Sequence, residues 1–188
     1  MRGKKTFVYF LRISGVLTLI CTLVAALISV VFALTDDVYQ ANLLATKQAS
    51  ISALFEQQKV ECENLPCARE SVQEVYRVTR NGELLGFCAN VSSSGFGGEV
   101  NMMVAVAPDG RLLGVDIVAM SETPGLGSRV GEEEYLSQYQ GLNAYGSPLD
   151  ESVDAISGAT ISSRAVMTGV QTALDALSEF ILAEVTVR

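Results

Sequence analysis

The chain has 188 residues, a formal net charge of −8 at pH 7, and neither histidine nor tryptophan. Without histidine it lacks the general base of Ser-His-Asp and Cys-His catalysis and the imidazole ligand of many zinc sites. Four of its 13 basic residues precede Ile13, which leaves nine against 21 acidic residues in the remainder. Because such an acidic surface repels a phosphate backbone, we expect no nucleic acid among the partners.

An uncharged apolar run extends from Ile13 to Leu34. As a helix these 22 residues span roughly 33 Å, enough to cross a hydrocarbon core of about 30 Å. Basic residues precede the run, and Asp36 and Asp37 follow it, so the positive-inside rule places residues 1–12 in the cytoplasm and the remainder outside. We therefore expect a single-pass anchor in the cell (inner) membrane. A cleaved signal peptide is the alternative, because residues 31–33 resemble a small-residue cleavage site.

The segment after the apolar run is typical of a helix. Leu43, Leu44, Ile51 and Leu54 follow a helical stripe and predict a helix over Val38–Gln58. We expect residues 35–70 to form a juxtamembrane helix and connector. An extracytoplasmic domain is expected to occupy residues 71–188.

Short alternating segments separated by turn residues predict an antiparallel meander. Asn81-Gly82 lies between two such segments and is a strong hairpin signal, while Pro108-Asp109-Gly110 predicts a turn. A loop is expected over Ser92–Gly98. The predicted strands are Val72–Arg80, Leu84–Val91, Val100–Ala107 and Leu112–Met120.

The C-terminal part of the sequence favours helices. We expect a loop at Glu122–Gly131, a short helix at Glu132–Tyr139, a short strand at Val153–Ile156 and a final helix at Arg164–Leu182. The predicted fold class is thus α+β: an N-terminal transmembrane helix followed by a twisted antiparallel sheet flanked by helices.

Two cysteines, Cys62 and Cys67, bracket the turn-like insert Glu63-Asn64-Leu65-Pro66. Outside the cytoplasm this spacing favours a local disulfide. Free thiols and a metal site remain as alternatives. A metal site is the weaker of these, because an iron–sulfur or zinc site needs four ligands and only Cys88 is left in the soluble part.

The segment Ser157-Gly158-Ala159-Thr160 directly precedes the pattern of the last helix. Small residues allow a ligand to approach the backbone, and a helix start offers unpaired N–H groups and the positive end of the macrodipole. With the hydroxyl of Thr160 and that of Ser162, these features describe a phosphate site. An ordinary Ser/Thr N-cap after a glycine turn is the alternative reading.

Two motifs carry a family resemblance. Asp154-x-x-Ser157-Gly158-Ala159-Thr160 resembles the sequence at which a flavin transferase couples FMN, through its phosphate, to the last threonine. The segment 121–128 resembles the other signature of the same FMN-binding domain, and the glycine-rich segment 94–98 resembles a weaker third feature. With its anchor, the chain resembles the G subunit of the Rnf electron-transport complex. The C subunit of the sodium-translocating NADH:quinone reductase is the nearest relative of that family.

The resemblance implies FMN held covalently by a phosphoester to Thr160. It also implies that Leu126 provides an apolar wall for the isoalloxazine ring and that Glu122 and Thr123 hydrogen-bond ring or ribityl groups. No contact is implied from Met120-Ser121, where family members often carry a histidine. The cofactor-binding residues expected on this basis are Thr160, Ser157, Gly158, Ala159, Ile161, Ser162, Glu122, Thr123, Gly125, Leu126 and Gly127.

By the same resemblance the chain is an electron relay, without a catalytic residue of its own, in a ferredoxin:NAD oxidoreductase coupled to sodium or proton transport. Its partners would be the integral-membrane, iron–sulfur and flavin subunits of the complex, and a flavin transferase during maturation. The alternatives are a component similar to the C subunit of the quinone reductase, a non-redox assembly subunit, and an extracellular flavin reductase or sensor acting alone.

Overall fold

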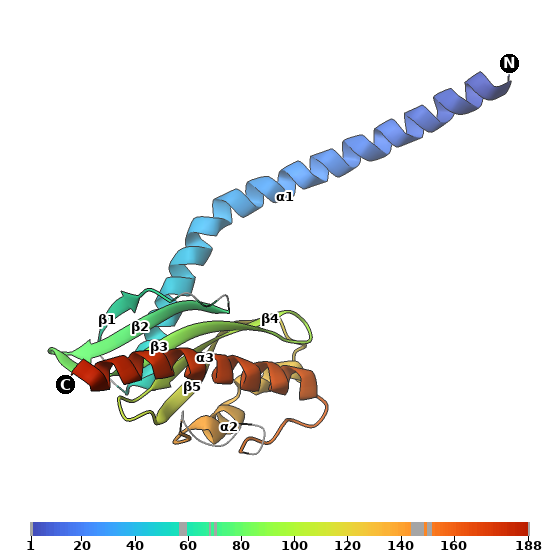
Figure 1. Ribbon diagram of the computed structural model, residues 1–188. Helices are drawn as coiled ribbons and strands as arrows, with labels where there is room; N and C mark the ends of the chain where they lie inside the picture. The colour runs from blue at the N-terminus through green and yellow to red at the C-terminus, as the bar shows by residue number, and fades with distance from the viewer. Residues whose placement is uncertain are drawn as a thin grey trace. The chain divides into compact units, whose positions relative to one another are not determined.

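The computed structural model describes residues 2–56, 60–67, 69, 71–143, 149 and 152–187 (Figure 1). The chain divides into two compact units, Met1–Ala45 and Thr46–Arg188. Helix α1 (Arg2–Leu54) begins in the first unit and ends in the second, so the two helices expected at 13–34 and 38–58 are parts of one continuous helix. This helix ends at Leu54, and residues 57–58 of the second expected helix lie outside the described residues.

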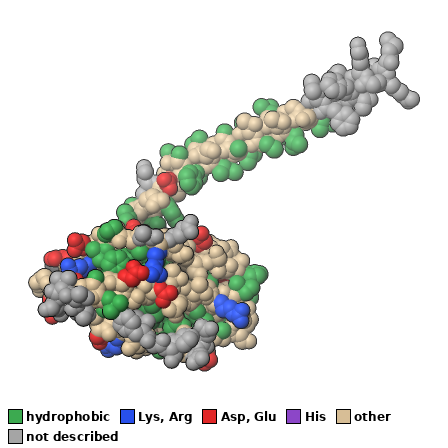
Figure 2. Space-filling view, viewed as in Figure 1, with side chains coloured by type: hydrophobic (Ala, Val, Ile, Leu, Met, Phe, Trp, Pro, Cys, Tyr) green, Lys and Arg blue, Asp and Glu red, His purple; other side chains and the backbone are tan. Residues whose placement is uncertain are grey.

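Within α1, the segment Arg12–Asp36 has a mean hydropathy of 2.8. It is the only helix in the described part of the chain that is long and apolar enough to cross a membrane. Its apolar side chains are exposed throughout, as Figure 2 illustrates. Exposed leucine, isoleucine and valine on every face of a helix are typical of a segment whose natural surroundings are lipid.

The second unit contains one antiparallel sheet in which every strand pairs with the next one along the chain. The meander and the α+β class are confirmed. Asn81 and Gly82 have φ values of 51° and 82°, which is the left-handed pair that a tight hairpin turn requires. The strands are β1 (Glu61–Leu65), β2 (Val72–Arg80), β3 (Glu83–Ser94), β4 (Glu99–Val106) and β5 (Leu112–Met120).

Helices cover the two faces of the sheet. Helix α3 (Thr160–Val187) packs across one face, where Val100, Met102 and Val104 of β4 are fully buried (Figure 1). Met103 and Ala105 of the same strand point to the opposite face and pack with Ile51 and Phe55 from the end of α1. Successive side chains of β4 therefore belong to two separate hydrophobic cores, because neighbouring side chains in a strand point to opposite faces of the sheet.

A run of short helices connects the sheet to α3. It comprises η1 (Gly127–Gly131), α2 (Glu133–Leu136) and η2 (Ser137–Tyr139). The short helix expected at 132–139 is confirmed, and the loop expected at 122–131 ends in the additional turn η1.

The turn-like insert expected between Cys62 and Cys67 is wrong, whereas the disulfide expected there is not formed in this structure and stays a prediction. Residues 61–65 form β1, which pairs with β2 along its full length, and both cysteines are free. A strand rises about 3.3 Å per residue, whereas a disulfide needs Cα atoms within about 7 Å. Residues 62–65 are extended, which disfavours a disulfide across this spacing.

Three other boundaries differ from expectation. The strand expected at Val153–Ile156 is absent, because the amides of Val153, Asp154 and Ile156 donate to Leu149 O, Gln138 Oε1 and Ser163 Oγ instead of to a neighbouring strand. Strand β3 continues through Ser94 into the expected loop, since Ser92–Ser94 pair with β4. Helix α3 begins at Thr160 rather than at Arg164.

Candidate functional site

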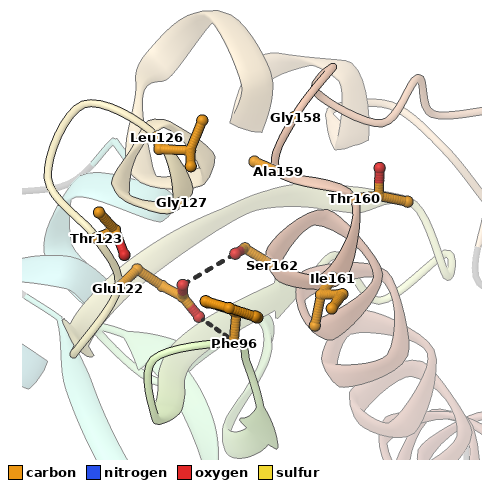
Figure 3. Close-up of a pocket in the computed structure, with 10 residues that line it drawn as sticks. All are labelled: Phe96, Glu122, Thr123, Leu126, Gly127, Gly158, Ala159, Thr160, Ile161 and Ser162. Carbon is orange, nitrogen blue, oxygen red and sulfur yellow. Dashed lines mark hydrogen bonds between the residues drawn. The ribbon is translucent and has the colours of Figure 1, made fainter.

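A pocket lies between the loop after β5 and the start of α3, and the tip of the β3–β4 loop forms its third side (Figure 3). Its volume is about 300 Å³, and its surface is mostly apolar. A volume of this size is at the small end of ligand sites, so it would enclose part of a larger ligand and leave the rest outside. The lining residues are Phe96, Glu122, Thr123, Leu126, Gly127, Gly158, Ala159, Thr160, Ile161 and Ser162.

The first turn of α3 is held by two consecutive serines. Ser163 is buried, and its Oγ accepts a hydrogen bond from the Ile156 amide at 3.0 Å, which holds the preceding turn against the helix. Its own amide donates to Ala159 O at 2.9 Å, the first hydrogen bond of the helix. Ser162 is also buried and donates from its Oγ to Glu122 Oε2 at 2.9 Å. The sequence starts a helix here because a glycine turn is followed by these local donors and acceptors.

Thr160 is exposed at this helix start. No hydrogen bond from a described residue engages its hydroxyl, and Figure 3 shows the side chain pointing away from Glu122. The amides of the first helical turn have no partner within the helix, so they favour a negative charge beside this threonine. The arrangement presents an accessible alcohol next to a site suited to an anion.

Two buried tyrosines support the same turn from behind. Tyr135 donates from its hydroxyl to Ser163 O at 3.2 Å, and the hydroxyl oxygens of Tyr135 and Tyr139 lie 3.0 Å apart. Burial raises the pKa of both hydroxyls above the ordinary value of a tyrosine, so both remain protonated at neutral pH. Neutral hydroxyl groups can donate here without placing a second buried charge near the pocket.

The loop after β5 is closed by its own hydrogen bonds. The amides of Leu126 and Ser128 donate to Thr123 O at 3.2 and 3.1 Å, and the Gly125 amide donates to Ser128 Oγ at 2.9 Å. This closed loop leaves the Leu126 side chain 47% exposed at the edge of the pocket. An apolar side chain is thus held in place over the cavity rather than buried beneath it.

The structure brings most of the predicted site residues together. Nine of the eleven line the pocket, while Ser157 and Gly125 belong to the adjoining turns but are not among the lining residues. Phe96 was not among the predicted residues, although the glycine-rich segment 94–98 that contains it was noted. A phenylalanine flanked by glycines is the signal in the sequence that would have identified it.

A metal centre has no support in the described residues, since no group of three or more His, Cys, Asp or Glu side chains is placed to hold an ion. The acidic side chain in the pocket wall, Glu122, accepts hydrogen bonds from protein groups instead.

Comparison with known proteins places residues 95–175 in a family model described as an FMN-binding domain. The chain is 31% identical over 175 residues to the G subunit of the ion-translocating oxidoreductase complex of Stutzerimonas stutzeri, covering 85% of this chain and 77% of that protein. It is 30% identical over 111 residues to the G subunit of the proton-translocating ferredoxin:NAD(+) oxidoreductase complex of Clostridium ljungdahlii, covering 56% and 60%. To the G subunit of the Na(+)-translocating ferredoxin:NAD(+) oxidoreductase complex of Acetobacterium woodii it is 34% identical over 113 residues, covering 54% and 53%.

Among solved structures, the crystal structure of Shewanella oneidensis NqrC is similar with a TM-score of 0.50 and 21% sequence identity. The match covers 64% of this chain and 69% of that one. At this identity the likeness concerns the fold.

Proposed function

Because the chain belongs to the G-subunit family of ion-translocating oxidoreductase complexes, we propose that it relays electrons through FMN bound covalently to Thr160. Membership makes it a subunit of a membrane oxidoreductase complex with an FMN-binding domain. The attachment residue, the contacts to the flavin and the relay role are the parts that we propose. The observation that supports these proposals is that Thr160 and Leu126 line the same pocket.

The residues in the pocket fit an FMN group. A mostly apolar cavity of about 300 Å³ suits a flat conjugated ring, and the exposed start of α3 suits a phosphate. The ring is expected against Leu126, with Thr123 hydrogen-bonding ring or ribityl groups. Gly158, Ala159, Ile161 and Ser162 are expected around the phosphate, with Ser157 in the preceding turn. Gly125 and Gly127 complete the loop that carries Leu126.

Covalent attachment uses the hydroxyl of Thr160. The reaction replaces the O–H bond of the side chain by an O–P bond, releases the proton and expels a leaving group from an activated flavin donor. A flavin transferase is the proposed catalyst, and the exposure of Thr160 supports access for it. The remaining negative charge of the diester would lie near the start of α3, where the dipole contributes a few tenths to about 1 kcal/mol.

When bound, FMN supplies the ability to accept and release electrons, and the protein holds and exposes it. The pocket opens to the surface and contains no catalytic base of the histidine type, which supports a relay rather than a site of substrate turnover. The proposed partners are the integral-membrane, iron–sulfur and flavin subunits of the same complex. The two ferredoxin:NAD(+) relatives carry different ions in their names, so we propose coupling to sodium or protons without choosing between them.

We also propose that Arg12–Asp36 crosses the membrane with the N-terminus in the cytoplasm and the FMN-binding domain on the other side. The hydropathy of the segment and the basic residues before it support this orientation. The proposed organisation is a cytoplasmic segment 1–12, a membrane helix 13–34, a connector 35–70 and the flavin domain 71–188.

The test replaces Thr160 by alanine in the full chain, expressed in a host that contains the flavin transferase. The wild-type band should fluoresce after denaturation, and intact mass should show one added flavin. Thr160→Ala should lose both signals. Thr123→Ala is the matched control, because it removes a threonine from the same pocket and should retain the attached flavin. A Thr160→Ala chain that keeps its covalent flavin would refute the attachment.

A second measurement separates the relay from a non-redox assembly subunit. Membranes containing Thr160→Ala should assemble the complex but lose ferredoxin-dependent reduction of NAD. Normal electron transfer in an assembled, flavin-free complex would favour the assembly role.

A further inference from the structure

The carboxylate of Glu122 is the meeting point of three segments of the chain. Its Oε1 accepts a hydrogen bond from the Phe96 amide at 2.7 Å, and both of its oxygens lie 3.4 Å from the Gly97 amide nitrogen. Its Oε2 accepts from Ser162 Oγ at 2.9 Å. Figure 3 shows the carboxylate between the β3–β4 loop and the first turn of α3.

These hydrogen bonds occupy the carboxylate oxygens of Glu122, which were expected to hydrogen-bond ring or ribityl groups of the flavin. Glu122 is only 8% exposed, and its hydrogen bonds run to protein groups. A buried carboxylate with charge-assisted hydrogen bonds to two segments fixes their separation more strongly than a neutral group does. The geometry of Glu122 is therefore better suited to connecting the β3–β4 loop with the start of α3 than to contacting a ligand.

Two glycines leave the space that this carboxylate occupies. A Cβ atom on Gly95 would lie 2.0 Å from Glu122 Oε1, and one on Gly127 would lie 2.4 Å from Glu122 Oε2. No side chain fits at either position while the carboxylate is in place. The buried carboxylate of Glu122 therefore explains why glycine stands at both 95 and 127, which belong to two separate segments.

The position of Phe96 depends on this connection through Glu122. Its amide is bound to Glu122, yet its side chain is 71% exposed at the edge of the pocket. Leu126 and Ile161, from the other two segments, are also about half exposed around the same cavity. Three apolar side chains held open around one pocket suit the contact surface of a flat aromatic ligand.

We propose that Glu122 is a positioning residue, which joins the β3–β4 loop to the start of α3 and so holds Phe96 as an apolar wall for the flavin ring. This inference rests on the proposed function for the identity of the ring. Phe96 contacts the cofactor and Glu122 acts through Phe96 and Ser162.

The first test needs no flavin. In the full chain carrying Thr160→Ala, purified in detergent, hydrogen exchange is measured on peptides covering residues 93–99 and 160–166. Adding Glu122→Ala should accelerate exchange in both peptides by about tenfold, the effect expected for loss of a hydrogen bond to a charged group. Glu122→Gln should restore much of the protection, because its amide oxygen still accepts from Phe96. Tyr135→Phe is the control: it removes a hydrogen bond to Ser163 and should affect only 160–166.

The second test reads the flavin itself in the chain that retains Thr160. Glu122→Ala and Phe96→Ala should produce the same shift in flavin absorption and the same fall in fluorescence anisotropy, while Glu122→Gln stays close to wild type. Phe96→Ala should leave exchange at 160–166 unchanged.

Unchanged exchange in Glu122→Ala, or a flavin spectrum insensitive to both alanine variants, would overturn the inference. Loss of thermal stability with an unchanged spectrum would reduce Glu122 to a structural role and also count against it. The exchange test stands even if Thr160 is not the attachment residue, so its failure is distinguishable from failure of the proposed function.

Discussion

The hydroxyl of Ser162 lies 2.9 Å from Glu122 Oε2, although 40 residues separate the two in sequence. Ser162 lies in the first turn of α3, directly after the attachment motif, and Glu122 belongs to the loop after β5. This hydrogen bond places the two motifs on opposite walls of one pocket. Substitutions of residues in contact with this hydrogen bond should therefore affect both motifs together.

Alanine at Gly127 should disrupt the pocket. Its Cβ would meet Glu122 Oε2 at 2.4 Å and Ser162 Oγ at 2.8 Å, so the carboxylate must move. We expect a loss of about 1–3 kcal/mol in the free energy of unfolding, together with weaker covalent flavin loading. Thermal unfolding and the fluorescence of the denatured band measure the two effects.

Alanine at Gly125 is the matched control for that change. Gly125 has φ of +75°, and no atom lies within 4 Å of the point that its Cβ would occupy, so alanine introduces backbone strain without a collision. It should cost roughly 1–2 kcal/mol but leave flavin loading near the wild-type value. Equal flavin loading in both variants would indicate that contact with Glu122 is unimportant for the site.

Aspartate at Leu126 should change the flavin without preventing its attachment. The side chain lines the pocket but comes from a different segment than Thr160. A carboxylate beside the ring disfavours the added negative charge of reduced flavin, so the midpoint potential should fall. A redox titration and an absorption spectrum check this, with Leu126→Met as the apolar control. If the potential and spectrum of Leu126→Asp match the wild type, the ring binds elsewhere.

The ion pair between Lys47 and Glu74 should make stability depend on acid pH. Burial alone would raise the pKa of Glu74, but hydrogen bonds from Lys47, Asn90 and Tyr76 outweigh it and lower that pKa below the ordinary value of 4.5. Since the folded-state pKa is the lower one, the contribution is complete above about pH 4.5 and is lost as the pH falls through the folded-state pKa.

Thermal unfolding of the full chain in detergent between pH 7 and pH 3 tests this. The unfolding temperature of the wild type should fall more steeply on acidification than that of Glu74→Gln. Glu83→Gln, at an exposed position, should behave as the wild type does. Parallel curves for the wild type and Glu74→Gln would show that the pair contributes nothing to the pH dependence.

The proposed orientation can be checked by labelling intact cells. Asp109 is exposed in the turn between β4 and β5, so a cysteine placed there should react with a membrane-impermeant maleimide. Cys62 and Cys67 are replaced by serine to remove competing thiols, while Cys88 is buried. Labelling that requires cell lysis would reverse the orientation.

Local patterns were enough to predict much of the fold. The apolar run at Ile13–Leu34, the Asn81-Gly82 hairpin and the alternating strands each depend on residues near one another in the chain. Backbone periodicity and turn conformation are set by such neighbours. The attachment motif at Thr160 and the loop at Leu126 were visible in the sequence for the same reason, because each is a short continuous segment.

The errors arose where a segment makes its hydrogen bonds to residues outside itself. Residues 61–65 carry mostly exposed side chains and read as a turn, but pairing with β2 makes them an edge strand. Val153–Ile156 is apolar enough for a strand, yet its amides find acceptors at Leu149, Gln138 and Ser163. The acceptor to which a backbone amide donates is decided by the folded chain and not by the local residue pattern.

The sequence by itself therefore determined the membrane-length helix, the antiparallel meander and the two motifs of the site. Only the tertiary structure decided that Glu122 joins those motifs and that Phe96 lies beside them. The physical reason is that a side-chain hydrogen bond across 40 residues leaves no periodic trace in the sequence. It depends on strand register and on the clearance that glycines at 95 and 127 provide.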